Sequence, residues 1–91
     1  MTKNDLHKKD KVYYAQIMPN LDVFEVCELI VRTIEDNYFV GIDKTNKHAH
    51  LIPYSKFGEL VFINRAECLE KVLLEEERKK IKPDELFNKK L

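Results

Sequence analysis

Three polar side chains of one short stretch have the residue types and spacing of metal ligands. Residues 38–54 alternate apolar and polar positions on both sides of the polar segment 43–47, which predicts two strands joined by a turn. His48 and His50 are two residues apart, so one strand face would carry both imidazoles, with Asp43 across the turn. A structural zinc site needs a fourth ligand, and the sequence places neither cysteine close to these three residues. We therefore expect Asp43, His48 and His50 to bind no metal and the protein to need no cofactor.

The two cysteines, Cys27 and Cys68, are the candidate nucleophiles, with His50 as a base. Neither belongs to a CxxC pair, and we expect both thiols to be reduced and buried, where an unactivated thiol behaves as a small hydrophobe. The carboxylates are spread along predicted strands and turns, which favours a solvated face over acid–base catalysis. They are Glu25, Glu28, Glu35, Asp36 and Asp43. The sequence therefore predicts no enzymatic activity.

The aromatic residues are numerous for a small domain, with four Tyr and five Phe. We expect the interior to be filled by aliphatic side chains and a thiol, which leaves some aromatics outside. The predicted interior consists of Val12, Cys27, Leu29, Val31, Val40, Ile42, Ile52 and Val61. The predicted binding surface consists of Tyr38, Tyr54 and Phe57 with a rim of Glu35, Asp36 and Lys56, because aromatic anchors in a polar rim are typical of interfaces. Core filling is the alternative role for each aromatic residue.

The elements that must position these residues are mainly strands. Residues 12–18 are rich in β-formers and stop at Pro19, and residues 24–34 predict one long strand that curves and changes the face it buries. After the hairpin at 38–54, residues 53–58 predict a short helical turn and residues 60–63 a final strand. The turn at 53–58 resembles the short helical turn that joins the last two strands of SH3-like barrels, and with it these elements are interpreted as a small SH3-like five-stranded antiparallel barrel.

A C-terminal helix is predicted from Arg65 to about Lys80, ending before Pro83. Asn64 is its expected N-cap, with Glu67 completing a capping box. The stripe expected to pack on the barrel is Ala66, Leu69, Val72 and Leu73, with Cys68 at its edge. The predicted class is mostly β with one packed α-helix.

Length and charge limit the possible functions. With 91 residues the chain has room for one domain, which we place at 11–81 between a mobile tail at 1–10 and a second tail at 82–91. Basic and acidic side chains balance at 16 each, and residues 12–63 are mildly acidic, a pattern that does not favour nucleic-acid binding. No apolar run is long enough for a membrane span or resembles a signal peptide, which predicts no membrane contact and a cytoplasmic protein.

Several short motifs resemble one group of proteins. They are 12–17 (VYYAQI), 26–29 (VCEL), 36–44 (DNYFVGIDK), 47–49 (KHA) and the strand-to-helix ending at 61–71 (VFINRAECLEK). Over residues 11–75 the chain is similar to small uncharacterised phage and prophage proteins of low-GC Gram-positive bacteria. The resemblance implies an SH3-like barrel with a C-terminal helix, and it carries no activity and no functional residue.

The expected function is that of a non-enzymatic phage or prophage accessory protein, a monomer or weak homodimer that binds a host protein in the bacterial cytoplasm. One alternative is a nucleic-acid-binding regulatory module. Another is an inhibitor of a host defence nuclease of the anti-CRISPR type, with a metal ion stabilising it. Salt dependence separates the first two, because phosphate binding weakens steeply as salt rises whereas an apolar protein interface scarcely responds.

Overall fold

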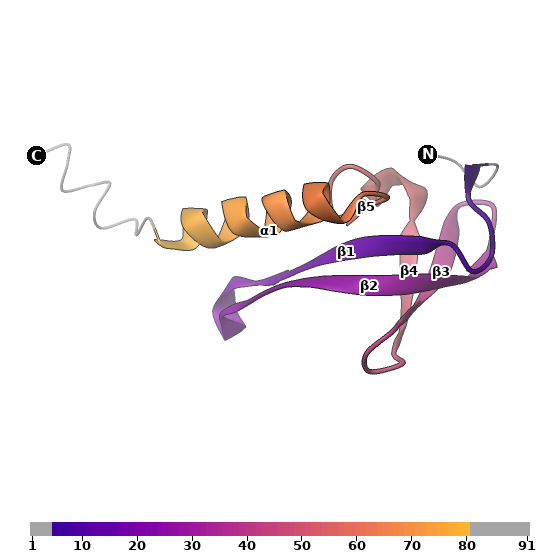
Figure 1. Ribbon diagram of the computed structural model, residues 1–91, viewed down its shortest axis with the longest axis horizontal. Coiled ribbons are helices and arrows are strands. Elements are labelled where there is room, and N and C mark those ends of the chain that lie inside the picture. Colours follow the sequence, from indigo (N-terminus) through magenta and orange to yellow (C-terminus); the bar gives the residue numbers. More distant parts are fainter. Residues whose placement is uncertain (1–4, 81–91) are drawn as a thin grey trace, which may run out of the picture.

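The computed structural model describes residues 5–80 and shows an antiparallel sheet with one helix on its outer side (Figure 1). Its five strands lie in the order β4-β3-β2-β1-β5. Strands β1 to β4 follow one another as a meander, and β5 returns to pair with β1, so the sheet curls into a half-barrel of SH3-like topology. The predicted fold class, a five-stranded antiparallel β fold with a packed C-terminal helix, is confirmed.

The first two strands form a long hairpin. β1 (Lys11–Met18) pairs with β2 (Val23–Ile34), and a 3-10 turn, η2 (Pro19–Leu21), connects them. The pairing of β2 with β3 shifts register between Val31 and Thr33. This bulge brings Ile34 onto the same side of the sheet as Leu29 and Val31, where it packs against the core. The predicted change of buried face within the long strand is confirmed.

The second hairpin joins β3 (Tyr38–Asp43) to β4 (Ala49–Pro53). Its buried face differs from the prediction, because Phe39, Gly41 and Asp43 point inward whereas Val40 and Ile42 lie half-buried on the outer face. Gly41 is needed at this point, since a Cβ atom there would lie 3.0 Å from Leu29 Cβ. The prediction of Val40 and Ile42 as interior residues is therefore wrong.

The chain closes the half-barrel through a short 3-10 helix. η3 (Tyr54–Lys56) lies within the predicted turn 53–58, and β5 (Val61–Phe62) follows it as a shorter strand than predicted. Successive residues of β5 serve opposite faces of the sheet: Val61 is buried inside the curl and Phe62 is buried beneath the helix. This short strand therefore links the two apolar cores of the protein.

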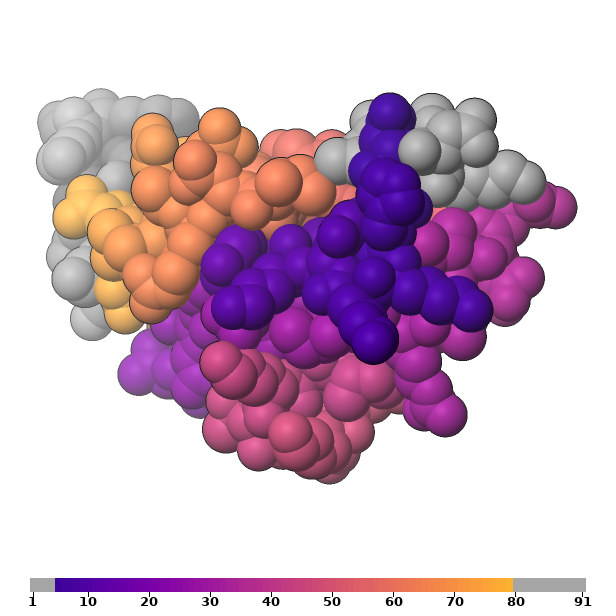
Figure 2. All heavy atoms as spheres, turned by 45° about the vertical axis from the view of Figure 1, so that its right-hand side comes forward, coloured from indigo at the N-terminus to yellow at the C-terminus, as the bar shows by residue number. Residues whose placement is uncertain are grey.

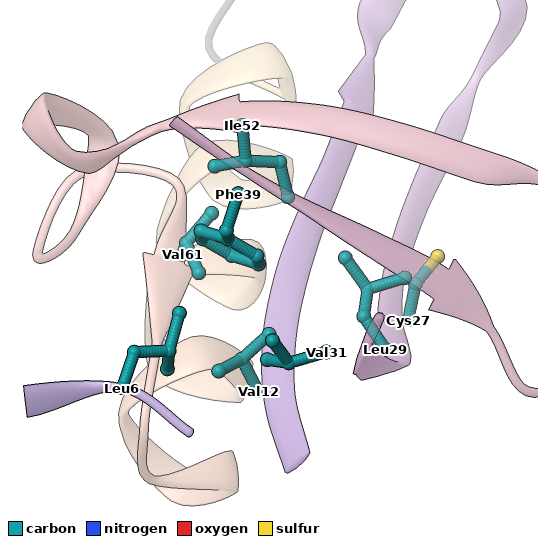
Figure 3. Packing of buried hydrophobic residues seen from close by; sticks show 8 residues of the cluster. All are labelled: Leu6, Val12, Cys27, Leu29, Val31, Phe39, Ile52 and Val61. Carbon is teal, nitrogen blue, oxygen red and sulfur yellow. The ribbon is translucent and has the colours of Figure 1, made fainter. Parts of the chain in front are cut away.

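The inner core lies in the hollow of the curled sheet. Figure 3 shows its buried side chains converging there: Leu6, Val12, Cys27, Leu29, Val31, Phe39, Ile52 and Val61. Leu6 comes from the N-terminal segment predicted as a tail. The segment is also held by backbone hydrogen bonds, because the Lys9 N–H donates to the Val31 oxygen at 2.8 Å and the Val31 N–H donates to the Asp10 oxygen at 2.9 Å.

The helix α1 (Arg65–Lys80) begins as predicted, because the Asn64 Oδ1 atom accepts the Ala66 N–H at 2.7 Å. It lies along the β1–β2 hairpin (Figure 1) and covers the outer core, whose buried members are Ala15, Phe62, Cys68 and Val72. At its far end the Lys79 Nζ atom lies 2.8 Å from Asp22 Oδ1 and 5.7 Å from the centre of the Phe24 ring.

The packed stripe of the helix differs from the prediction. Cys68 and Val72 are buried against the sheet, whereas Leu69, Leu73 and Ala66 are exposed. Cys68 and Val72 are four residues apart and therefore lie above each other on one helix face, one turn apart. The predicted burial of Ala66, Leu69 and Leu73 is wrong, and that of Val72 is confirmed.

Candidate functional site

The candidate metal ligands do not converge. Asp43 is buried, and its Oδ1 atom accepts the N–H groups of Thr45 at 2.8 Å and Asn46 at 3.3 Å, so this carboxylate caps the turn. His48 is exposed in the turn before β4, while His50 lies on β4 with its ring centre 5.5 Å from that of Tyr14. Within residues 5–80, no three His, Cys, Asp or Glu side chains are grouped closely enough to hold a metal ion.

The two thiols are free and buried. Burial, with the nearby Asp43 carboxylate adding to it, raises the pKa of the Cys27 thiol to about 11, and its Sγ donates to Gln16 Oε1 at 3.1 Å. Burial likewise raises the pKa of Cys68 to about 11, although Arg65 opposes the shift. Both groups are therefore protonated at neutral pH, which is the unreactive form of a cysteine.

The predicted aromatic surface is divided between the two sides of the sheet. Tyr54 and Phe57 are half-buried and stack on Phe39, with ring centres 6.1 and 5.5 Å from it. The Tyr54 hydroxyl donates to the Glu35 backbone oxygen at 2.7 Å, which brings Glu35 to the same end of the inner core. Tyr38 lies on the opposite face from Phe39, because neighbouring residues of a strand alternate.

The rim residues of that surface lie around the same end of the sheet. Glu35 and Asp36 are exposed in the turn between β2 and β3, and the Lys56 Nζ atom lies 3.5 Å from Glu59 Oε1. The structure thus joins Tyr54, Phe57 and Glu35 and sets Tyr38 apart. Binding of a partner at this surface stays a prediction, and the stacking on Phe39 gives Tyr54 and Phe57 a role in the inner core as well.

The outward side of α1 carries a cluster of exposed leucines that the periodicity had assigned in part to the core. Leu69, Leu73 and Leu74 have exposed fractions of 37%, 51% and 55%. A hollow of about 440 Å³ lies on this side and is lined by Leu73, Leu74 and carboxylates. Those carboxylates are Glu70, Glu76 and Glu77. We call Leu69, Leu73, Leu74 and these three glutamates the leucine surface.

One signal in the sequence could have identified the leucine surface. Adjacent leucines on a helix are about 100° apart, so Leu73 and Leu74 cannot both face the sheet. Once Cys68 and Val72 are taken as the packed pair, Leu73 and Leu74 fall to either side of the outward face. The prediction chose Leu69 and Leu73 instead because leucine is a large aliphatic residue.

Comparison with known proteins leaves the chain without an identified relative, since no family model, no curated protein and no solved structure matches it. As for the membrane, the described part of the chain, residues 5–80, contains no helix of the length and apolar character needed to cross one.

Proposed function

We propose that the protein is a non-enzymatic binding protein and that another protein docks on the leucine surface of α1. The observation that carries the proposal is the exposure of Leu69, Leu73 and Leu74 on a helix whose opposite side is already packed through Cys68 and Val72. These leucines contribute little to the two cores. A cluster of exposed apolar side chains bordered by charged residues is typical of a protein interaction site.

The acidic residues of the leucine surface restrict the chemistry of the partner. Glu70, Glu76 and Glu77 line the same hollow as Leu73 and Leu74. A partner that offers apolar side chains beside Lys or Arg fits both features, whereas a second copy would bring carboxylates against carboxylates. We therefore expect the protein to be a monomer or a weak homodimer.

The chemistry of the potential catalytic groups supports a binding role. Both thiols are protonated at neutral pH because burial raises each pKa to about 11. The Asp43 carboxylate is engaged by the turn that it caps, and the His50 ring packs beside Tyr14. The Asp43 carboxylate and the Cys27 thiol are thus engaged by hydrogen bonds within the fold, whereas the His50 Nε2 atom is buried without a hydrogen-bond partner among residues 5–80.

The resemblance described above supports a setting for this activity. We propose that the partner is a protein of a Gram-positive bacterial host and that the encounter takes place in the cytoplasm of that host during infection or lysogeny. The two free thiols suit a reducing compartment, where cysteines remain unpaired. From the sequence, inhibition of a host defence nuclease is an alternative function. A nuclease of this kind would be one such host partner.

The proposal is tested by capturing a partner from lysate of a Gram-positive host and measuring its affinity for defined variants. Leu73→Ser and Leu74→Ser should each weaken the recovered complex by about tenfold, the effect of losing one apolar anchor of an interface. Leu51→Ser is the matched control, because Leu51 is exposed on β4, away from the helix.

The same affinities measured at several salt concentrations identify the class of partner. An apolar interface with a few ion pairs should lose less than about tenfold between low and physiological salt. Unchanged affinity in both helix variants would contradict the proposal. A steep loss of affinity with salt, together with recovery of nucleic acid, would instead favour the regulatory module.

A further inference from the structure

A second surface lies on the outer face of the sheet, over β3 and the part of β2 near Ile30, beyond the stretch of β2 that the helix covers. Ile30 and Ile42 are direct cross-strand neighbours there and are both half-buried. Together with Val31 and three cationic residues they line a hollow of about 330 Å³. The cationic residues are Lys8, Lys9 and Arg32. We call these six residues the cationic hollow.

The N-terminal segment builds one wall of the cationic hollow. Leu6 is buried in the inner core, and backbone hydrogen bonds join Lys9 and Asp10 to Val31. Lys9 adopts a left-handed conformation with φ of 75°, which turns the chain at this point. Figure 2 shows this segment in indigo lying against the magenta residues of β2 and β3. The lysines are therefore held beside β2 by the fold.

The cations of this hollow form no ion pair with the acidic side chains of the described part of the chain. Several other Lys and Arg side chains form ion pairs, such as Lys44 with Glu28 at 3.3 Å and Lys71 with Glu75 at 3.0 Å. Lys8, Lys9 and Arg32 are exposed and have no ion pair with any residue in the 5–80 range. An apolar floor with unpaired cations around it is complementary to a ligand that carries an apolar group between negative charges.

We propose that the cationic hollow binds an acidic peptide segment of a partner protein. One aliphatic side chain of the segment enters the hollow over Ile30 and Ile42, and its flanking carboxylates pair with the cations around it. Arg32 is suited to a bidentate contact with a carboxylate, and the lysines act as point charges. A peptide fits better than a nucleic-acid strand, because stacking of bases needs aromatic side chains and those of this floor are aliphatic.

This surface is independent of the leucine surface. The two share no residue, and they prefer ligands of opposite charge. Figure 1 shows α1 extending toward the β1–β2 turn, whereas the N-terminal segment lies at the other end of the hairpin. The protein can therefore hold two chain segments at once, and failure of either interaction leaves the other one testable.

The test is a titration of ¹⁵N-labelled protein, observed by amide chemical shifts, with an acetylated heptapeptide that has one leucine flanked by glutamates. We expect saturable shifts at Lys8, Lys9, Arg32 and Ile42. Replacing the leucine of the peptide by glycine should weaken binding about tenfold or more, because one buried aliphatic side chain is lost. An oligo-thymidylate is the nucleic-acid probe.

Charge-reversal variants locate the binding site. Arg32→Glu should weaken peptide binding about tenfold at low salt, and Lys8→Glu provides a second variant in case the bulge next to Arg32 tolerates the change poorly. Arg65→Glu is the matched control, because Arg65 is exposed at the start of α1, and Leu73→Ser should bind the peptide normally. Thermal unfolding verifies that each variant is folded.

The proposal is overturned if no saturable shifts appear at millimolar peptide, if they map elsewhere, or if Arg32→Glu and Lys8→Glu both bind as the wild type does. It is also overturned if the oligo-thymidylate binds more tightly than the peptide and loses its affinity in the same variants, because the hollow would then be a nucleic-acid site.

Discussion

Substitution of two neighbouring helix residues distinguishes the packed side of α1 from its exposed side. Val72 is 3% exposed and lies in the outer core with Ala15, Phe62 and Cys68. Val72→Ala removes two buried methyl groups, worth about 1.6 kcal/mol of transfer free energy, and the cavity that remains raises the loss to about 2 kcal/mol. The corresponding fall in melting temperature is about 8 °C or more for a domain of this size.

The matched variant is Leu73→Ala, which removes more carbon atoms than Val72→Ala. Leu73 is 51% exposed, so much of its side chain contacts water in the folded protein. The higher helix propensity of alanine offsets part of the remaining loss, and we expect a change of less than about 1 kcal/mol. The smaller chemical deletion at Val72 should therefore cost more stability than the larger deletion at Leu73.

The assay is urea unfolding followed by circular dichroism, with the free energy of unfolding extrapolated to water for the wild type and both variants. The three free energies can be compared if the wild type and both variants have the same m-value, the slope of the free energy of unfolding against urea concentration. The reasoning is refuted if Leu73→Ala costs as much as Val72→Ala. Leu73 would then be a core residue, and the leucine surface would lose its central member.

The remaining predictions concern the inner core and the thiols. Phe57→Ala should lower the free energy of unfolding by about 2 kcal/mol, because Phe57 stacks on the buried Phe39 at 5.5 Å; a melting temperature within a degree or two of the wild type would place Phe57 outside the core. For Cys27 and Cys68, the folded-state pKa of about 11 exceeds the ordinary value of 9.0. Alkylation by iodoacetamide at pH 8 should thus be about 100-fold slower in the native than in the urea-unfolded protein. Because the folded protein holds these thiol protons more tightly than the unfolded chain does, the pH also affects stability. The stability that the protonated thiols confer is complete below pH 9 and is lost as the pH rises through 11. Equal alkylation rates, or a flat stability profile over that range, would contradict the assigned burial.

Local patterns in the sequence predicted most of the elements. The β-rich run that stops at Pro19, the long second strand with its change of face, and the Asn64 cap all appear in the structure. These features depend on a few adjacent residues, through turn chemistry, strand propensity and the hydrogen-bonding capacity of a cap.

The orientation of two elements could not be read from hydrophobicity alone. In β3, Val40 and Ile42 look like the buried set, yet Gly41 is buried because it approaches Leu29 closely and Asp43 because it caps the turn. In α1, the small residue Cys68 is completely buried, and the larger Leu73 is half exposed. Close packing against a sheet selects for shape as much as for apolar character.

The two candidate binding surfaces were missed for different reasons. The leucine surface was missed because the prediction assigned Leu69 and Leu73 to the packed side of α1. The cationic hollow depends on tertiary structure, because Lys8 and Lys9 reach Ile30, Arg32 and Ile42 through the docking of the N-terminal segment on β2. No short-range pattern connects these positions, so this site required the folded structure.

The central claim, that a protein partner docks on the leucine surface, is tested most directly by site-specific photocrosslinking. A benzoylphenylalanine at position 73 is irradiated in lysate of a Gram-positive host, with position 47 in the β3–β4 turn as the control site. We predict one dominant protein adduct from position 73, which excess unlabelled wild type suppresses and excess Leu73→Ser variant does not. The absence of a saturable adduct at position 73, or the same adduct from position 47, would contradict the claim.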